Sequence, residues 1–187
     1  RVFVSALIAS AISSAFADTP RSAFGPHSTA EEVTKGLDLS GNTAVVTGCN
    51  SGIGFETMRV LALRGTHVIG TARTRDKGLE ACAKVSGRAT PVVLELADFP
   101  SVVACADRIR TLTSRIDMLI LNAGVIVDGF EQVYGLEKHF VVNHLGHFLL
   151  ANRLLDLVKA ATQGRVVTVG SGKHHVTAPG GIHFDKL

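Results

Sequence analysis

The sequence predicts an α/β protein with a Rossmann-like, doubly wound parallel sheet, and three observations lead to this fold class. Five short apolar runs are continuous rather than alternating, which is typical of parallel strands covered on both faces. Segments with helical periodicity lie between these runs. A glycine-rich turn follows the first run, at the carboxyl end of a strand, where sheets of this kind bind ligands.

The expected strands and helices alternate along the chain from residue 42 onward. The helix expected over 53–65 ends on Gly65, a residue suited to a helix C-terminus, and the helix over 99–115 has Pro100 in its first turn. A long segment, about 136–161, separates the last two strands. The order β-α-β-α-β-α-β-α-β predicts a right-handed doubly wound sheet. Its five strands are TAVVT (43–47), HVIGTA (67–72), PVVLEL (91–96), DMLIL (117–121) and RVVTV (165–169).

Length and composition indicate one globular domain. The 187 residues suffice for a hydrophobic core, and 46% hydrophobic against 19% charged residues excludes a disordered chain. The net charge is +3 and the sequence contains no dense Lys/Arg run, so we expect no nucleic-acid partner. The three cysteines, Cys49, Cys82 and Cys105, are odd in number and lack metal-like spacing, which argues against a disulfide framework.

The N-terminal residues 1–17 read as a secretory signal peptide. A basic Arg1 precedes an apolar run, and Ala15-Phe16-Ala17 matches the small-residue pattern of a cleavage site before Asp18. Export to the periplasm or the medium is therefore expected. The alternatives are a buried or disordered N-terminal helix, or a cytoplasmic enzyme with an uncleaved tail. Residues 18–41 form a polar segment, with a short helix expected within 28–41 and capped by Ser28 or Thr29.

The stretch TGCNSGIG, residues 47–54, can cradle a phosphate group. Gly48 permits a sharp turn after the strand, while Gly52 and Gly54 leave backbone N–H groups open at the start of the next helix. Asn50 and Ser51 can add side-chain hydrogen bonds. The spacing is neither G-x-G-x-x-G nor a P-loop, so a plain turn is the alternative.

The end of the second strand bears on the type of nucleotide. NAD sites usually have an Asp or Glu there, which binds the ribose 2′-hydroxyl. Here the residues are TARTRD (71–76), with Arg73 and Arg75 and no acid before Asp76. A guanidinium suits a 2′-phosphate, so NADP is favoured over NAD. Two solvated loop arginines are the alternative interpretation.

Four stretches together resemble the short-chain dehydrogenase/reductase family, over about residues 40–187. They are TGCNSGIG (47–54), LNAG (121–124), VNHLGHFLL (142–150) and GGIHFDKL (180–187). The last two are similar to the branch that contains retinol dehydrogenases and WW-domain oxidoreductases. Within VNHLGHFLL, His144 and His147 are interpreted as structural, because no third metal ligand accompanies them at a suitable spacing.

The resemblance implies a role for each matching position. Asn143 would be the helix asparagine that orders a water in the proton relay, and Ser171 the serine that hydrogen-bonds the reacting oxygen. Glu95 stands where the family has Asp, and Gly170 where many members have Ser, which are departures. The cofactor-binding residues implied are Gly48, Asn50, Ser51, Gly52, Ile53 and Gly54 at the pyrophosphate, Arg73 at the 2′-phosphate, Glu95 and Leu96 beside the adenine, and Asn122, Ala123 and Gly124 at the adenine ribose.

The family's proton donor is the Tyr of a Tyr-x-x-x-Lys pair that follows the serine. The chain's single tyrosine, Tyr134, precedes Asn143, so its literal match with Lys138 is interpreted as fortuitous. We therefore expect residues 42–187 to be an incomplete NAD(P)-binding domain, truncated after the fifth strand and inactive as a dehydrogenase. The strand left uncovered would favour homo-oligomers.

The function expected from the resemblance is that of an NADP-dependent oxidoreductase. It would interconvert an alcohol and a carbonyl on a small, lipophilic molecule, without a metal. The alternative is a non-catalytic nucleotide-binding protein or an inactive fragment.

Overall fold

A computed structural model describes residues 23–25 and 27–172. The expected signal peptide and the stretch 180–187 lie outside these residues. Among the described residues, those up to Val33 belong to one unit and residues 34–172 to another. In the first unit, α2 (Ala30–Val33) is shorter than the expected helix. Thr29 caps it as predicted, because its N–H donates to Glu32 Oε2 (2.7 Å) while the Glu32 N–H donates to Thr29 Oγ1 (3.2 Å).

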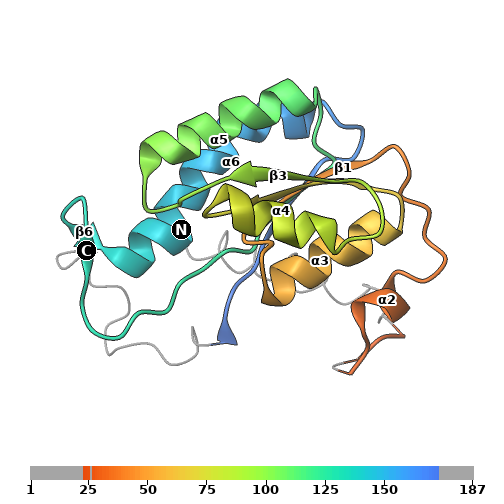
Figure 1. The fold of residues 1–187 in the computed structure, drawn as a ribbon, viewed down its shortest axis with the longest axis horizontal. Helices are drawn as coiled ribbons and strands as arrows, with labels where there is room; N and C mark the ends of the chain where they lie inside the picture. The colour runs from red at the N-terminus through yellow and green to blue at the C-terminus, as the bar shows by residue number, and fades with distance from the viewer. Residues whose placement is uncertain (1–22, 26, 173–187) are drawn as a thin grey trace, which may run out of the picture. The chain divides into compact units, whose positions relative to one another are not determined.

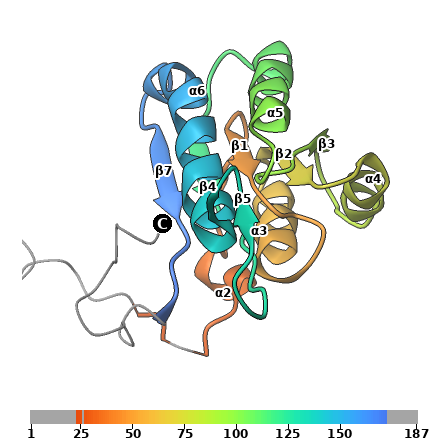
Figure 2. The ribbon, with the colours of Figure 1, turned by 90° about the vertical axis from the view of Figure 1, so that its left-hand side faces the viewer.

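The second unit contains a five-stranded parallel sheet in the order β3-β2-β1-β4-β7. Figure 2 shows these strands side by side, with β7 at one edge and β3 at the other. The order runs outward from β1 in both directions, which confirms the predicted doubly wound sheet. The strands are β1 (Thr43–Val46), β2 (His67–Ala72), β3 (Ala89–Val93), β4 (Met118–Leu121) and β7 (Arg165–Thr168).

Helices cover both faces of this sheet (Figures 1 and 2). One face carries α3 (Gly52–Leu63) and α4 (Arg75–Ala83), and the other carries α5 (Phe99–Leu112) and α6 (His147–Lys159). Neighbouring residues of a strand point to opposite faces, so the core is split in two. Val45 and Ile69 pack in the cluster that includes Ile109, Leu150 and Leu154, whereas Ala44, Val46 and Val68 pack with Met58, Leu61 and Ala81.

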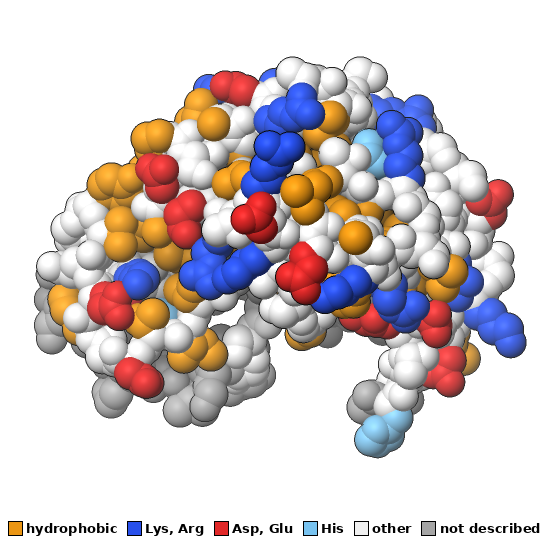
Figure 3. Space-filling view, in the orientation of Figure 1, with side chains coloured by type: hydrophobic (Ala, Val, Ile, Leu, Met, Phe, Trp, Pro, Cys, Tyr) orange, Lys and Arg blue, Asp and Glu red, His pale blue; other side chains and the backbone are white. Residues whose placement is uncertain are grey.

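The outer surface of the helices mixes both signs of charge. On the side of the molecule that faces the viewer in Figures 1 and 3, where both α4 and α5 are visible, Lys/Arg and Asp/Glu side chains are interspersed. Two ion pairs join α5 to α6: Arg110 Nη2 lies 2.6 Å from Asp156 Oδ1, and Arg153 Nη2 lies 3.3 Å from Asp107 Oδ1. Among the described residues, no helix is both long enough and apolar enough to span a bilayer.

β3 is the edge strand opposite β7, and it differs from its predicted bounds. It starts at Ala89 and ends at Val93. Leu94 still donates its N–H to the Ala72 carbonyl of β2 (2.9 Å), and the side chains of Leu94 and Leu96 are buried beyond the end of the strand. Pro91 lies in the middle of the strand, paired with Gly70 of β2.

A small antiparallel hairpin follows the sheet strand β4. It consists of β5 (Gln132–Val133) and β6 (Leu136–Glu137), with Tyr134 at its turn in a left-handed conformation (φ 56°). The Tyr134 ring stacks on Phe99 at 4.8 Å between ring centroids, and its hydroxyl accepts a hydrogen bond from the Phe99 N–H (3.3 Å). The hairpin therefore holds Tyr134 against the start of α5.

Candidate functional site

The glycine stretch forms the turn between β1 and α3, as the sequence predicts. Gly48 has φ +73° and Gly52 has φ +58°, a region that side-chain-bearing residues rarely adopt. The Gly48 N–H donates to Thr71 Oγ1 (3.4 Å) and the Cys49 N–H to the Thr71 carbonyl (2.8 Å), so the turn is fastened to the end of β2. Because α3 begins at Gly52, the N–H groups of its first turn have no partner within the helix and can receive an anion.

Gly54 has a different task from the other two glycines. It is buried in the first turn of α3, and a Cβ there would lie 2.2 Å from the Gly48 carbonyl oxygen and 2.5 Å from Asn122 Nδ2. Only glycine allows α3 to approach both the turn at Gly48 and the residue Asn122 after β4 so closely. Its role is therefore to bring the helix N-terminus up to the turn.

A cleft of about 370 Å³ opens at the carboxyl ends of β1, β2 and β4. Its size is within the usual range for small-molecule sites. The sequence-predicted cofactor residues gather here with one exception, Gly52, which is exposed beside the cleft. The lining residues are Gly48, Asn50, Ser51, Ile53, Gly54, Thr71, Ala72, Arg73, Leu94, Glu95, Leu96, Asn122, Ala123, Gly124, Val125 and Val142.

The two arginines after β2 lie in different places. Arg73 lines the cleft, while Arg75 is the first residue of α4 and lines a separate groove with Leu79 and Val93 along β3. Thr74 between them caps α4, because its Oγ1 accepts the Lys77 N–H (3.4 Å). The structure thus brings one of the two arginines to the cleft.

Glu95 and Leu96 border the cleft after β3, where the sequence places them. The Glu95 carboxylate is turned back onto its own loop, since Oε1 accepts the Ala97 N–H (3.0 Å). The Glu95 N–H in turn donates to Ser101 Oγ (3.0 Å). The longer side chain therefore orders the loop that carries Leu96.

Asn122, Ala123 and Gly124 form a wall of the cleft, fixed by Thr47. The N–H groups of Asn122 and Ala123 both donate to Thr47 Oγ1 (2.9 Å each), and Asn122 Nδ2 donates to the Thr47 carbonyl (2.9 Å). Thr47 is fully buried at the end of β1. Sequence analysis missed this residue as part of the site, although it opens the TGCNSGIG stretch.

Asn143 lies on a π-helical segment, η1 (Phe140–Gly146), directly before α6. Its amide makes two hydrogen bonds with Val125, the lining residue that follows the wall: Oδ1 accepts the Val125 N–H (2.8 Å), and Nδ2 donates to the Val125 carbonyl (3.1 Å). Asn143 Oδ1 lies 3.5 Å from the position of a Cβ on Gly124. Asn143 thus adjoins the cleft without lining it, and π-helical turns often occur at functional sites.

Ser171 and Tyr134 both lie outside the cleft lining. Ser171 is exposed and comes three residues after Thr168, at the carboxyl end of β7. β7 pairs with β4, whose own end leads into Asn122, so the loop of Ser171 starts at the same edge of the sheet as the wall. Tyr134 instead lies against the start of α5, where its hydroxyl accepts the Phe99 N–H.

Cys49, His144 and His147 have the chemistry of a nucleophile or of metal ligands, but each is accounted for by burial, ring stacking or hydrogen bonding. Cys49 is 2% exposed, and burial raises the pKa of its thiol to about 12, so it is not a thiolate nucleophile. His144 is exposed, and its ring stacks between Phe140 and Phe148. His147 is buried and bonded to Thr47. Within residues 23–25 and 27–172, no group of three His, Cys, Asp or Glu side chains could hold a metal ion.

Comparison with known proteins identifies the family. The family model of the short chain dehydrogenases matches residues 42–184. The chain belongs to the short-chain dehydrogenase family. Short-chain dehydrogenase TIC 32 B of Brassica napus is 38% identical over 178 residues, with 89% of this chain and 56% of that protein covered. Retinol dehydrogenase 11 of Mus musculus is 40% identical, over 82% of this chain and 50% of that protein.

Other relatives agree with the branch suggested by VNHLGHFLL. The WW domain-containing oxidoreductase of Gallus gallus is 36% identical, over 84% of this chain and 39% of that protein. A solved structure of a short chain dehydrogenase/reductase family protein aligns with a TM-score of 0.65 and 30% identity, over 74% of this chain and 59% of that one. The chain spans about half the length of the curated relatives it matches. Short-chain dehydrogenases are oxidoreductases that bind nicotinamide cofactors. The cleft of this chain lies at the carboxyl ends of the strands, where doubly wound sheets bind ligands.

Proposed function

We propose that this short-chain dehydrogenase uses NADP(H) to interconvert an alcohol and a carbonyl group on a lipophilic small molecule. The observation that supports NADP most directly is Arg73, whose side chain lines the cleft immediately after β2. The residues around it, Ala72 and Thr74, are uncharged, so the acid that would bind a 2′-hydroxyl is missing from this strand end. A guanidinium there favours a 2′-phosphate by charge and by its forked donors.

The lining of the cleft supports positions for the other parts of a dinucleotide. The turn 48–54 and the first turn of α3 would receive the pyrophosphate, with Asn50 and Ser51 as side-chain donors. Leu96 would lie against the adenine, and the wall of Asn122, Ala123 and Gly124 along the adenine ribose. A bound NADP(H) supplies the hydride chemistry of the reaction.

Two residues next to the cleft would serve the substrate. The Ser171 hydroxyl would donate a hydrogen bond to the substrate oxygen, which gains negative charge as a carbonyl is reduced. Asn143, held by both hydrogen bonds to Val125, would hold a water on the path of the proton. The lipophilic substrate class is supported by the similarity to retinol dehydrogenase 11.

Titration with both cofactors tests the proposal. We expect NADP to bind more tightly than NAD, and Arg73→Ala to weaken NADP by about 10- to 100-fold through loss of charge-assisted hydrogen bonds, with little change for NAD. Arg75→Ala is the matched control. It removes the same charge only two residues along the chain, but Arg75 lines the separate groove along β3 and not the cleft. Equal affinities of the wild type for NADP and NAD would refute the cofactor preference.

A non-catalytic nucleotide-binding protein is the competing function. NADPH consumption with lipophilic aldehydes and ketones separates the two when it is measured on a protein that also carries the family's Tyr-x-x-x-Lys pair after Ser171, because a binding protein would retain NADPH without oxidising it. In that protein, the Ser171→Ala variant should lower turnover and leave the affinity for NADPH unchanged.

A further inference from the structure

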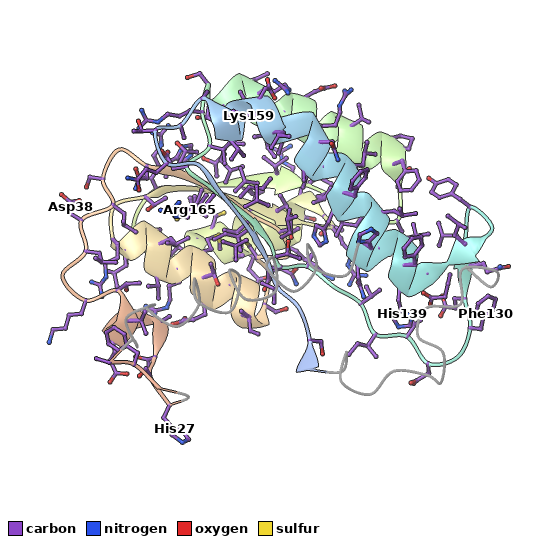
Figure 4. All side chains as sticks on the ribbon, turned by 180° about the vertical axis from the view of Figure 1, so that it is seen from behind. His27, Asp38, Phe130, His139, Lys159 and Arg165 are labelled. Carbon is purple, nitrogen blue, oxygen red and sulfur yellow. The ribbon has the colours of Figure 1, made fainter. Side chains whose placement is uncertain are left out.

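Three polar side chains at intervals of four residues hold residues 122–127, that is, the wall of the cleft and the residues that follow it; two of them do so directly and one through Thr47. They are His139, Asn143 and His147, at the start of η1, within it, and at the start of α6. Figure 4 shows η1 and α6 as one continuous rod from His139 to Lys159. His139 Nε2 accepts the Val127 N–H (3.1 Å), and Asn143 binds both backbone groups of Val125.

His147 reaches the same wall through Thr47 rather than directly. Its Nε2 lies 2.9 Å from Thr47 Oγ1, and Thr47 Oγ1 accepts the N–H groups of Asn122 and Ala123. The other ring nitrogen, Nδ1, lies 3.2 Å from the Asn143 carbonyl oxygen. His147 therefore connects the end of β1, the wall after β4 and the π-helical turn.

The count of donors at Thr47 fixes the protonation state of this ring. A threonine hydroxyl has two lone pairs and one hydrogen. Both lone pairs are used by Asn122 and Ala123, so the Thr47 hydroxyl must donate its hydrogen, and His147 Nε2 must accept it. The Asn143 carbonyl can only accept, so Nδ1 must carry the proton. His147 is thus neutral, with Nδ1–H and a bare Nε2.

We propose that His147 is a positioning residue of the nucleotide cleft, which in its neutral Nδ1–H tautomer orients the Thr47 hydroxyl and through it holds the Asn122–Ala123 wall. The inference rests on the proposed function for the identity of the ligand in the cleft. It assigns a task to the second histidine of VNHLGHFLL, which the dehydrogenase chemistry itself does not use.

The surroundings of His147 favour the uncharged ring. The side chain is 5% exposed, and burial lowers its pKa, against a raising effect of the Asn143 carbonyl and with a further lowering from His144. A proton on Nε2 would point at an oxygen whose two lone pairs are already occupied. Charging the ring would therefore release Thr47, and with it the two amide groups of the wall.

The tautomer can be observed directly in the wild-type protein. Long-range nitrogen–proton NMR spectra distinguish protonated from bare ring nitrogens. At pH 7.5 we expect Nδ1 protonated and Nε2 bare for His147, the opposite of the tautomer that usually dominates in water. An Nε2–H tautomer or a charged ring at this pH would overturn the inference, and the measurement requires neither a variant nor a nucleotide.

A matched pair of variants tests the positioning. The amide oxygen of Gln can take the acceptor position of Nε2, whereas Phe fills the same space without an acceptor. We expect His147→Phe to accelerate hydrogen exchange of the Asn122 and Ala123 amides and to raise the Kd for NADPH about tenfold. His147→Gln should keep the exchange rates and the Kd at their wild-type values. His144→Gln, at an exposed position three residues earlier, should also change neither quantity.

The outcomes separate this inference from the proposed function. Wild-type exchange at Asn122 and Ala123 in folded His147→Phe would overturn the positioning role. Wild-type protein that fails to bind NADPH, yet shows the Nδ1–H tautomer and the exchange difference, would overturn the cofactor and leave the positioning role standing.

Discussion

Gly54→Ala is the substitution that most directly tests how the cleft is built. The added methyl group would lie 2.2 Å from the Gly48 carbonyl oxygen and 2.5 Å from Asn122 Nδ2, where contacts below 3.0 Å essentially never occur. The nearer of these atoms is backbone, so the helix and the turn must separate by roughly 1 Å to restore normal contact. Overpacking of this kind costs about 3 kcal/mol, and the better helix propensity of Ala returns about 1 kcal/mol.

The expected net loss in the free energy of unfolding is therefore about 2 kcal/mol or more. For a domain of this size, such a loss lowers Tm by roughly 4–8 °C. NADPH affinity should fall as well, because Gly48 and Asn122 both line the cleft and both must move.

Gly52→Ala is the matched control within the same turn. Gly52 has φ +58°, but apart from its chain neighbours and its own helix backbone no atom lies within 4 Å of the position that a Cβ would take. Its cost is the left-handed conformation alone, about 1–2 kcal/mol, partly offset by the lower entropy of the unfolded chain. Thermal unfolding and NADPH titration of the two variants check the argument. Wild-type Tm and affinity in Gly54→Ala would refute the close approach of α3 to the turn.

Two further predictions concern titration and thiol chemistry. The free energy of unfolding should fall as pH drops below about 6.5. Burial lowers the pKa of His67 and His147 in the folded protein, so the unfolded chain takes up protons first. Each histidine can lower the free energy of unfolding by up to about 1.4 kcal/mol per pH unit. Urea unfolding between pH 8 and pH 5.5 measures this, with a shallower slope expected for His147→Gln, and a flat profile would contradict it. A thiol reagent should modify Cys82 first in the native protein and reach Cys49 and Cys105 only after denaturation. The reason is that burial raises the pKa of the Cys49 and Cys105 thiols to about 12. Rapid reaction of all three cysteines in the native protein would contradict this.

Much of the fold follows from local patterns in the sequence. β2 begins and ends at the predicted residues, His67 and Ala72, because a strand buried on both faces is apolar throughout and sharply bounded. The turn at Gly48 is equally local, since a positive φ there calls for glycine. Thr74 could have located α4, because a threonine before a helix commonly caps it.

The features that sequence analysis missed depend on distant residues. β3 ends at Val93 rather than residue 96 because Leu94 and Leu96 are buried beside the cleft, and an apolar run alone does not distinguish sheet from cleft. Thr47 and His147 are 100 positions apart, so no spacing rule connects them. Asn143, on the π-helical turn, likewise hydrogen-bonds Val125, 18 positions away, which no local pattern indicates.

Pro91 bears on how the molecule meets other copies of itself. The Leu94 N–H points inward to the Ala72 carbonyl of β2, and alternate residues of a parallel strand face opposite neighbours. Pro91, three positions earlier, therefore directs its ring nitrogen toward the open side of β3. A chain approaching this side to prolong the sheet would find no hydrogen there to accept. Pro91, in the middle of the five-residue edge strand β3, thus opposes edge-to-edge pairing with another chain, while the hydrogen bonds between β3 and β2 remain intact.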